Sequence, residues 1–406
     1  MYLSISRRFE FCASHKYGVP DWSAEKNFET FGPEAKGRYG HGHNYAAYFI
    51  LHGQVDPQSG MMLNLLHVKG KIAPVIDGRF DHKFLNLDTP PFNEIQPTPE
   101  NLAQQLLDEV QPIFSDDHVT PVVCHLRESP TRAATAYHSG RTESDLWMDF
   151  SAARRTYSPH LSDAENRELF GRASAVGGSG HHFRLRVTLQ GDIDPHTGMI
   201  VPDQISRTVL CNLRGELNHR NLDDIPFLSG QPQTTEILAL YIWRKLKPEL
   251  PMSRVCLYDS GGFFVEYHGN NEFMLGLAAQ FHAAHRLHSP NLTDRENEEL
   301  YGVCGNPNGH GHLFDVECTL CGSLDERSGT LQNVGGLSAE LADILEEWDY
   351  KHLNLEVPEF GNKASTGENI VRSLWRKLDP RVDGNLQRLR LLETVNNRFS
   401  LRREIG

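Results

Sequence analysis

Nine residues decide the fold of this chain: Cys304-Gly305-Asn306-Pro307-Asn308-Gly309-His310-Gly311-His312. A strand that begins at His310 places His310 and His312 on one face, because side chains alternate along a strand. A third imidazole comes from His285, which ends the strand-like stretch Phe281-His282-Ala283-Ala284-His285. Three histidines with an open fourth position are a ligand set of catalytic zinc. The stretch therefore predicts a zinc site with a cysteine close by.

A near copy of this pattern lies at the start of the chain. His15 ends the stretch Phe11-Cys12-Ala13-Ser14-His15, and Gly40-His41-Gly42-His43 follows at a similar spacing. One His-x-His alone is more often an ordinary surface strand, but two matching sets indicate metal binding. We therefore expect two zinc ions per chain, one held by His15, His41 and His43 and the other by His285, His310 and His312.

The chain contains three tandem copies of one unit. A turn-like Asp-Pro-x-Ser/Thr-Gly-Met begins at Asp56 and at Asp194, and a looser copy begins at Asp325. Each turn precedes a loop with Asp or Asn and then a helix start, where a threonine is the expected N-cap and a glutamate lies in the first turn. These threonines are Thr98, Thr235 and Thr366. Short linkers predict docked repeats at 1–140, 145–269 and 272–406.

Each unit is predicted to run strand, long loop, strand, helix, helix, strand, strand. In the first unit, alternation predicts a strand over 45–51, and helical spacing of apolar residues predicts helices over 68–76 and 102–110. Residues 119–126 and 133–137 are expected to form a closing hairpin.

Composition restricts the class of protein. The 406 residues are 39% hydrophobic and 23% charged, with a net charge of −13, which argues against broad nucleic-acid binding and against attraction to anionic membranes. No apolar run has membrane-spanning length, and the N-terminus lacks a signal-peptide core. Seven cysteines without a framework spacing favour a reducing compartment. We expect a cytoplasmic protein with no nucleic-acid or membrane partner.

These motifs resemble the 6-pyruvoyltetrahydropterin synthase family, which includes the 6-carboxytetrahydropterin synthases. The resemblance extends over all three repeats and is strongest in the third, in Phe281-x-Ala283-x-His285-Arg286-Leu287, in Tyr301-Gly302-x-Cys304-x-Asn306-Pro307-Asn308-Gly309-His310-Gly311-His312 and in Leu392-Glu393-Thr394-x-Asn396-Asn397. It implies an α+β fold of three tandem T-fold units, each a four-stranded antiparallel sheet with two helices, closed into a pseudo-trimeric β-barrel. Two chains would pair into the usual six-unit assembly, a homodimer of pseudo-trimers.

The resemblance also implies roles for individual residues. Cys304 matches the family's proton-abstracting cysteine, and a zinc ion within a few residues should favour its thiolate. Asp81 and His82 match the family's Asp-His pair, which a neighbouring unit supplies. The third repeat has Tyr350 in place of that histidine, and tyrosine is a poor base near neutral pH because its ordinary pKa is about 10.

The other two repeats depart from the family pattern. Repeat 1 has no cysteine: Ala35 lies six residues before His41, as Cys304 does before His310, and Glu34 is either a carboxylate base or a solvated loop glutamate. In repeat 2, Arg154 or Arg155 replaces the upstream histidine, Ser179 replaces the first histidine of the triplet, and Ala173 lies where Cys304 lies. Repeat 2 is expected to be structural.

Carboxylates complete the expected site. Glu128 and Glu393, with Asp259 in repeat 2, match the family's pterin-site position, where a carboxylate suits the two adjacent N–H donors of the pterin's amino-pyrimidinone edge. We place Glu128 and Glu393 in both the catalytic and the substrate-binding sets. Helix capping or pterin binding explains the helix-start residues Glu100, Glu236, Glu368 and Thr366.

The expected function is zinc-dependent conversion of 7,8-dihydroneopterin triphosphate to 6-pyruvoyltetrahydropterin with loss of triphosphate, which is the chemistry of a carbon–oxygen lyase. A 6-carboxytetrahydropterin synthase and a non-catalytic pterin-binding or scaffold protein remain alternatives. Because repeats 1 and 3 lack complementary residues, one hypothesis gives each chain a single complete site. In it, Cys304 and its zinc meet Asp81 and His82 where the two ends of the chain join.

Overall fold

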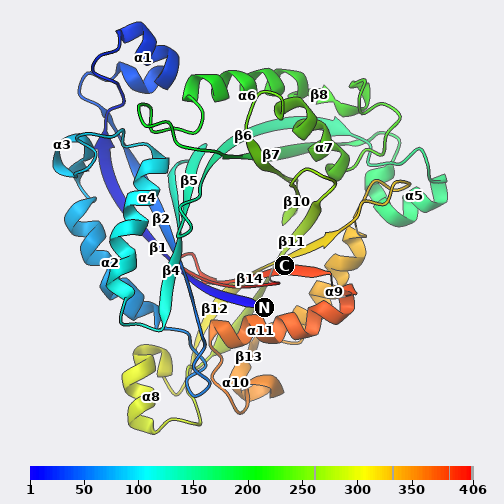
Figure 1. The fold of residues 1–406 in the computed structure, drawn as a ribbon. Helices are drawn as coiled ribbons and strands as arrows, with labels where there is room; N and C mark the ends of the chain where they lie inside the picture. Colours follow the sequence, from blue (N-terminus) through cyan, green and yellow to red (C-terminus); the bar gives the residue numbers. More distant parts are fainter. Residues whose placement is uncertain (260–261, 332, 384, 404–406) are drawn as a thin grey trace.

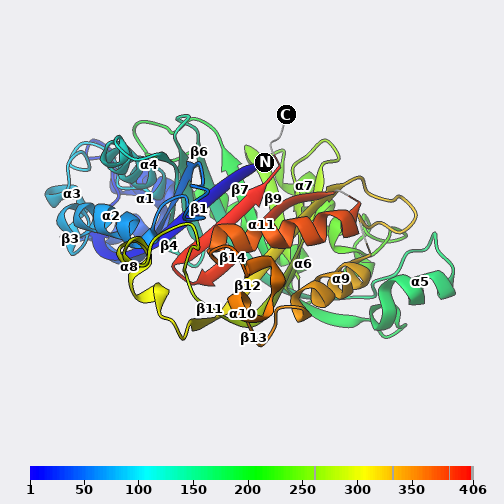
Figure 2. The ribbon, with the colours of Figure 1, turned by 90° about the horizontal axis from the view of Figure 1, so that it is seen from below.

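Strand alternation sets the framework of each repeat. In β1 (Tyr2–His15), Leu3, Ile5, Phe9 and Phe11 are buried on one face, and His15 continues that face at the end of the strand. The computed structural model describes residues 1–259, 262–331, 333–383 and 385–403. In that part of the chain, each repeat contributes four long strands and a set of helices packed on the outside of the sheet (Figures 1 and 2).

The long strands of the three repeats are, in order, β1, β2 (His41–Gly53), β4 (Val119–Ser129) and β5 (Arg132–Tyr137); β6 (Thr142–Arg154), β7 (Ser179–Gln190), β9 (Met252–Tyr258) and β10 (Phe263–Tyr267); and β11 (Phe273–His285), β12 (His310–Gly322), β14 (Leu386–Thr394) and β15 (Asn397–Arg402). Three two-residue strands extend the sheet beside the first strand of each repeat: β3 (Lys83–Phe84), β8 (Arg220–Asn221) and β13 (Lys351–His352).

The helices of repeat 1 are α1 (Ala24–Phe31), α2 (Leu65–Arg79), α3 (Leu85–Asp88) and α4 (Pro99–Val110). Those of repeat 2 are α5 (Asp163–Phe170), α6 (Asp203–Leu217) and α7 (Thr235–Leu246), and those of repeat 3 are α8 (Asp294–Tyr301), α9 (Val334–Glu346), α10 (Leu353–Glu356) and α11 (Gly367–Leu378). The strands and helices predicted for repeat 1 are all present, but most extend beyond the predicted bounds.

The long strands close into a barrel. Their order is β10-β9-β7-β6-β5-β4-β2-β1-β15-β14-β12-β11, and β11 pairs again with β10. The repeats meet edge to edge at β5–β6, β10–β11 and β15–β1, and the last of these pairs places the two ends of the chain side by side. Closure leaves no long sheet edge exposed in the described part of the chain. The predicted α+β fold of three T-fold units in a pseudo-trimeric barrel is confirmed.

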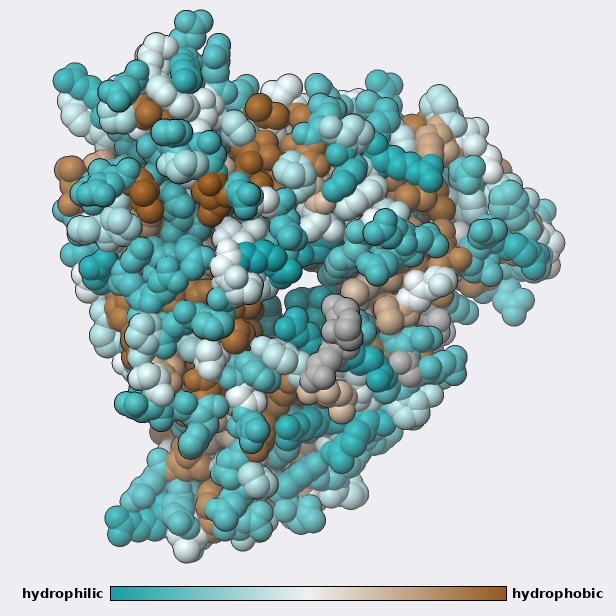
Figure 3. Space-filling view, in the orientation of Figure 1, coloured by the Kyte–Doolittle hydropathy of each residue, from teal (hydrophilic) through white to brown (hydrophobic). Residues whose placement is uncertain are grey.

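The two faces of the sheet differ in chemistry. The outer face and the helices form apolar cores, one of which is shared by repeats 1 and 3. Charged side chains pair from strand to strand elsewhere in the sheet, as where Arg254 Nη2 donates to Glu143 Oε2 at 2.9 Å and Arg390 Nη1 to Glu317 Oε1 at 2.8 Å. Buried charges of this kind are tolerated because they are paired. The space-filling view is hollowed at its centre, where the barrel opens (Figure 3).

The sense of rotation around the barrel follows from three matching contacts. Thr98 caps α4 and donates to the carbonyl of Gly198 at 2.6 Å, and Thr234 caps α7 and donates to the carbonyl of Gly329 at 2.6 Å. Thr366 caps α11 and donates to the carbonyl of Gly60 at 2.7 Å. The start of this capped helix in repeat 1 therefore contacts repeat 2, that in repeat 2 contacts repeat 3, and that in repeat 3 contacts repeat 1. The predicted cap Thr235 is wrong by one residue: Thr234 caps α7, which gives Thr-x-Glu spacing in all three repeats.

Among the described residues, no helix is long and apolar enough to cross a membrane.

Candidate active sites at the repeat interfaces

Two histidine triads assemble where the first two strands of a repeat end. His15 pairs with His41 in the β1–β2 register, and His285 pairs with His310 in the β11–β12 register. His43 and His312 follow two residues later on the same face. In each triad, the nitrogen atoms that could bind a metal lie within 4.8 Å of one another. Strand register therefore brings together the two ligand sets that the sequence predicts.

The orientation of the histidine at the base of each triad suits a metal. His285 Nδ1 lies 2.9 Å from the carbonyl of Ser365, and His15 Nδ1 lies 3.0 Å from the carbonyl of Pro97, so each ring donates there and turns Nε2 towards the triad. Burial lowers the pKa of His15 to about 3 and that of His285 to about 4, which keeps both rings neutral. Nε2 of His285 and of His312 is buried without a hydrogen-bond partner. These atoms fit a bound cation.

Cys304 lies beside the triad of repeat 3. Helix α8 ends at Gly302, and a tight turn over Gly302–Gly305 carries Cys304 towards β12. The backbone N–H of Leu287 donates to the carbonyl of Cys304 at 2.9 Å, which fixes the turn next to the end of β11. The thiol is half-buried; burial and the nearby Glu393 raise its pKa, an effect that a cation at the triad would oppose.

Repeat 1 requires a correction at the matching position. The turn after α1 covers Gly32–Lys36 and is one residue longer than its counterpart in repeat 3. Counted from the glycine that ends the helix, Glu34 and not Ala35 occupies the place of Cys304. Counting back from His41 gave Ala35 because the extra residue follows Glu34. Glu34 Oε2 lies 3.9 Å from His41 Nε2, so this glutamate faces the triad.

Two carboxylates of repeat 3 lie near its triad and near the turn of repeat 1. Glu393 Oε1 lies 3.7 Å from His285 Nε2, at the end of β14. Glu368 Oε1 accepts the backbone N–H of Met62, from the repeat 1 turn, at 2.9 Å. Burial raises the pKa of Glu368 to about 7. Capping does not account for this glutamate, because Thr366 performs that role.

Repeat 1 carries the equivalent carboxylates in a different setting. Glu128 Oε1 accepts from the hydroxyl of Tyr17 at 3.2 Å and lies 3.9 Å from His15 Nε2. Burial raises the pKa of Glu128 to about 8. Glu100 is buried beside the guanidinium of Arg132. Tyr17 and Arg132 were not identified from the sequence, because neither belongs to a motif shared by the repeats.

Among the residues of repeat 2 that the structure describes, no histidine triad is present. Arg154, and not Arg155, takes the place of the buried histidine, since it pairs with Ser179 as His15 pairs with His41. Arg154 donates to Asp259 Oδ2 at 2.8 Å, and His181 Nδ1 lies 2.8 Å from the other oxygen of Asp259. A cavity of about 530 Å³ remains there, and its lining includes Ala173, Glu236 and the start of α9. The guanidinium of Arg154 thus occupies the position at which the other two repeats could bind a metal.

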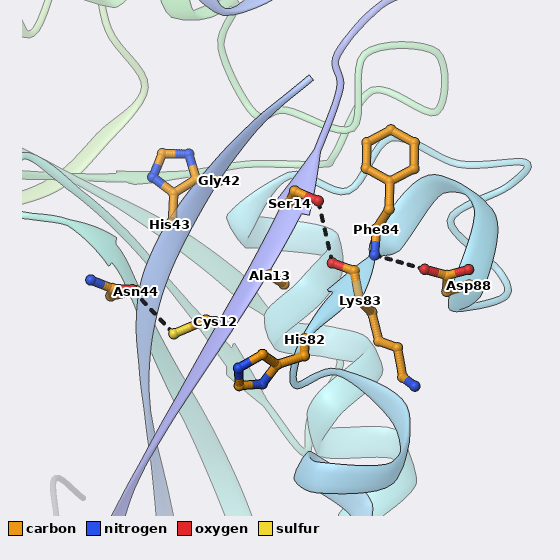
Figure 4. Close-up of a pocket in the computed structure, with 10 residues that line it drawn as sticks. All are labelled: Cys12, Ala13, Ser14, Gly42, His43, Asn44, His82, Lys83, Phe84 and Asp88. Atoms are coloured by element: carbon orange, nitrogen blue, oxygen red, sulfur yellow. Dashed lines mark hydrogen bonds between the residues drawn. The ribbon is translucent and has the colours of Figure 1, made fainter. Parts of the chain in front are cut away.

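The Asp81–His82 turn lies on the outside of its own repeat. Asp81 Oδ1 accepts the backbone N–H of Cys12 at 2.8 Å, and Asp81 Oδ2 lies 2.7 Å from His82 Nδ1. The His82 ring borders a cavity of about 620 Å³ with Cys12 and Asn44 (Figure 4). His82 and Tyr350 both adopt positive φ, and their exposed fractions are 82% and 80%.

The cysteine of repeat 3 faces repeat 1, but other residues make the described contacts there. Asn64 donates to the carbonyl of Leu300 at 2.6 Å, and Tyr301 donates to the carbonyl of Ser59. These contacts come from the Asp-Pro-x-Ser-Gly-Met turn and the start of α2. The sequence identified this turn only as a marker of the repeat; its presence in all three units was the available signal that it serves a shared site.

Comparisons with known proteins identify the family of the three units. A sequence profile described as 6-pyruvoyl tetrahydropterin synthase matches residues 4–139, 146–270 and 275–404. The 6-pyruvoyl tetrahydrobiopterin synthase of Pongo abelii is 40% identical over 119 residues, which are 29% of this chain and 82% of that protein. Its Homo sapiens counterpart is 39% identical over the same shares.

Solved structures match about a third of the chain each. The 6-pyruvoyl tetrahydropterin synthase of Caenorhabditis elegans covers 33% of this chain and 96% of its own length, with 32% identity and a TM-score of 0.32. The profile matches nearly the whole chain in three consecutive segments. The chain therefore belongs to the 6-pyruvoyl tetrahydropterin synthase family, with three units of that family in one polypeptide.

Proposed function

We propose that this chain converts 7,8-dihydroneopterin triphosphate to 6-pyruvoyltetrahydropterin with elimination of triphosphate, and that repeat 3 carries the reaction. The observation that supports this proposal is the set of groups gathered at the repeat 3–repeat 1 interface. A histidine triad, a half-buried thiol and two carboxylates meet there. The names of the relatives supply the substrate class and the product.

Each group has a distinct task in this proposal. Glu368 and Glu393 accept the N–H donors of the pterin edge and fix the ring. His285, His310 and His312 hold zinc, the metal that three imidazoles with an open position favour, and zinc supplies Lewis acidity for the oxygens of the substrate's side chain. Cys304, as the thiolate, accepts the proton of the adjacent C–H group, and the triphosphate leaves with the electrons of its C–O bond.

The Asp81–His82 pair is assigned to the site of a second copy of the chain. The pair is exposed and bound to its own repeat through Cys12, so a partner chain stacked on this end of the barrel can reach it. We propose a homodimer of pseudo-trimers in which Asp81 and His82 of one chain exchange protons with Cys304 of the other. This arrangement replaces the one in which both ends of a single chain complete the site.

One assay tests the reaction. Purified, zinc-loaded protein is incubated with 7,8-dihydroneopterin triphosphate, and the products are separated by chromatography. Formation of 6-pyruvoyltetrahydropterin with stoichiometric triphosphate is the expected result. A 6-carboxy product would move the chain to the other branch of the family, and binding of the substrate without any product would make it a pterin-binding protein.

A further inference from the structure

Arg132 is buried beside the carboxylates of repeat 1. It begins β5 and pairs with Ser129 across the β4–β5 hairpin. The equivalent pair in repeat 3 is Asn397 with Thr394, across the β14–β15 hairpin. At this position, repeat 1 therefore has a permanently charged guanidinium and repeat 3 has a neutral amide.

The guanidinium of Arg132 is buried among acids from two repeats. Arg132 is 5% exposed; its Nη2 lies 3.6 Å from Glu100 Oε2, and its Nη1 donates to Asp203 Oδ1 at 3.3 Å. Glu100 belongs to repeat 1, whereas Asp203 is the first residue of α6 in repeat 2. Charges buried in this way hold one another in place, because loss of either partner leaves an unpaired charge.

The ion pairs continue to the mouth of the site. Arg207 Nε donates to Asp203, and Arg207 Nη2 donates to Glu34 Oε1 at 3.1 Å. Glu34 occupies the place of the repeat 3 cysteine. Ion pairs of alternating charge thus connect Arg132 with Glu34, the residue beside the triad.

The donor pattern of a guanidinium matches that of a pterin edge. Both present coplanar N–H groups on one carbon atom, and both suit the two oxygens of a carboxylate. A pterin that entered repeat 1 would need Glu100 and Glu128, but Arg132 already lies between these acids and the neighbouring repeat. In repeat 3, by contrast, Asn397 is neutral: its Nδ2 donates to Glu393 Oε2 at 3.0 Å, and its Oδ1 accepts from Arg7 Nη1.

We propose that Arg132 takes the place of the pterin in repeat 1, so that each chain holds a metal at two triads but binds a pterin at one site only, in repeat 3. This inference rests on the proposed function for the ligand class. It assigns repeat 1 a metal site whose substrate pocket is closed by its own side chain, and it makes Arg132 the residue that sets the number of pterins per chain.

The first test opens the closed pocket. In R132N/D203L, repeat 1 receives the residues of the open interface, because Asn397 and Leu65 are the counterparts of Arg132 and Asp203. The two substitutions remove the guanidinium together with one of its carboxylate partners, which limits the number of unpaired buried charges. Equilibrium dialysis with biopterin, a stable pterin, should give one site per chain in the wild type and two in this variant. Two sites in the wild type would overturn the proposal, and so would a folded R132N/D203L chain that binds no more biopterin than the wild type.

The second test closes the open pocket and covers the case in which the first variant does not fold. Arg7 faces Asn397 across β1–β15, where Leu146 faces Arg132 in repeat 1. R7L/N397R therefore copies the closed pair into repeat 3, with R7L alone as its matched control. Relative to R7L, biopterin affinity should fall at least about tenfold while zinc stays at two per chain. Equal affinity in the two variants would contradict the proposal.

The two proposals fail in different ways. A wild-type chain that binds no biopterin at all contradicts the proposed function. Even then, a gain of one site in R132N/D203L supports the role of Arg132, and no gain in the folded variant contradicts it.

Discussion

Repeats 1 and 3 share their triads and differ in what surrounds them. His15 and His285 have the same register, an equivalent backbone carbonyl as the acceptor for Nδ1, and a pKa that burial lowers. Next to them, repeat 1 has Glu34 and Arg132 where repeat 3 has Cys304 and Asn397. The comparison teaches that two units can keep the same metal ligands, which strand register brings together, while the side chains that would bind a substrate at the interface change separately.

Replacing the two residues beside the triads should give the largest contrast. Cys304→Ala removes the proposed base and should lower kcat by about a hundredfold or more, which is the usual contribution of proton transfer by a positioned side chain. Glu34→Ala changes the same position of repeat 1, where Arg207 already binds the carboxylate, and should alter kcat less than about twofold. Steady-state kinetics with 7,8-dihydroneopterin triphosphate measures both.

A large loss of turnover in the Glu34 variant would reverse this comparison and make repeat 1 the catalytic unit. Zinc content serves as the control in both variants, because neither residue belongs to a triad.

Metal content separates the triads from repeat 2. The wild type should bind two zinc ions per chain, and His285→Ala and His15→Ala should each bind one, since two imidazoles hold zinc poorly. His181→Ala should leave the content at two, because Asp259 and Arg154 surround that ring. Elemental analysis after zinc-replete purification measures the ratio. Equal turnover losses in the His15 and His285 variants would show that repeat 1 also contributes to the reaction.

Mixing two inactive variants decides where the Asp-His pair acts. Cys304→Ala and His82→Ala chains should each have low turnover. If His82 serves the cysteine of a partner chain, a mixed dimer regains one of its two sites, so the doubly purified mixed dimer should reach about half of the wild-type turnover. If both residues serve a site within one chain, no pairing restores it. Co-expression with two different tags, followed by kinetics on the doubly purified dimer, makes this measurement.

Much of the fold could be predicted because local sequence patterns specify it and because these patterns occur in all three repeats. Alternation predicted β2, apolar helical spacing predicted α2 and α4, and the repeated turns predicted the number of units. The first two strands also predicted the triads, since residues two apart on a strand share a face. Element ends were less certain: β2 begins at His41, four residues before the alternating stretch that predicted it.

The rest of the site depends on tertiary contacts that no local pattern records. Ala35 was matched to Cys304 by counting back from the histidines, but the chain inserts a residue after Glu34, so counting from the end of the helix was needed. Arg132 and Asp203 belong to different repeats and meet only when the barrel closes. Their pairing replaces a ligand, and the sequence of one repeat alone carries no sign of it.

The smallest expected effect concerns a buried carboxylate in repeat 2, and it sharpens the comparison with repeat 3. Glu236 accepts the backbone N–H of Leu331 at 3.2 Å, as Glu368 accepts that of Met62, and burial raises the pKa of Glu236 to about 7 from an ordinary value of 4.5. The unfolded chain therefore ionises first, and the folded state loses stability as pH rises from about 4.5 to about 7. Glu236→Gln keeps the acceptor oxygen and removes this cost. We expect the variant to gain up to about 3 kcal/mol in the free energy of unfolding at pH 8 and almost nothing at pH 4. Urea unfolding at the two pH values measures the gain, and turnover should be retained because repeat 2 has no triad. A gain of the same size at both pH values would place its origin outside ionisation, and a loss of turnover would mean that repeat 2 serves the reaction after all.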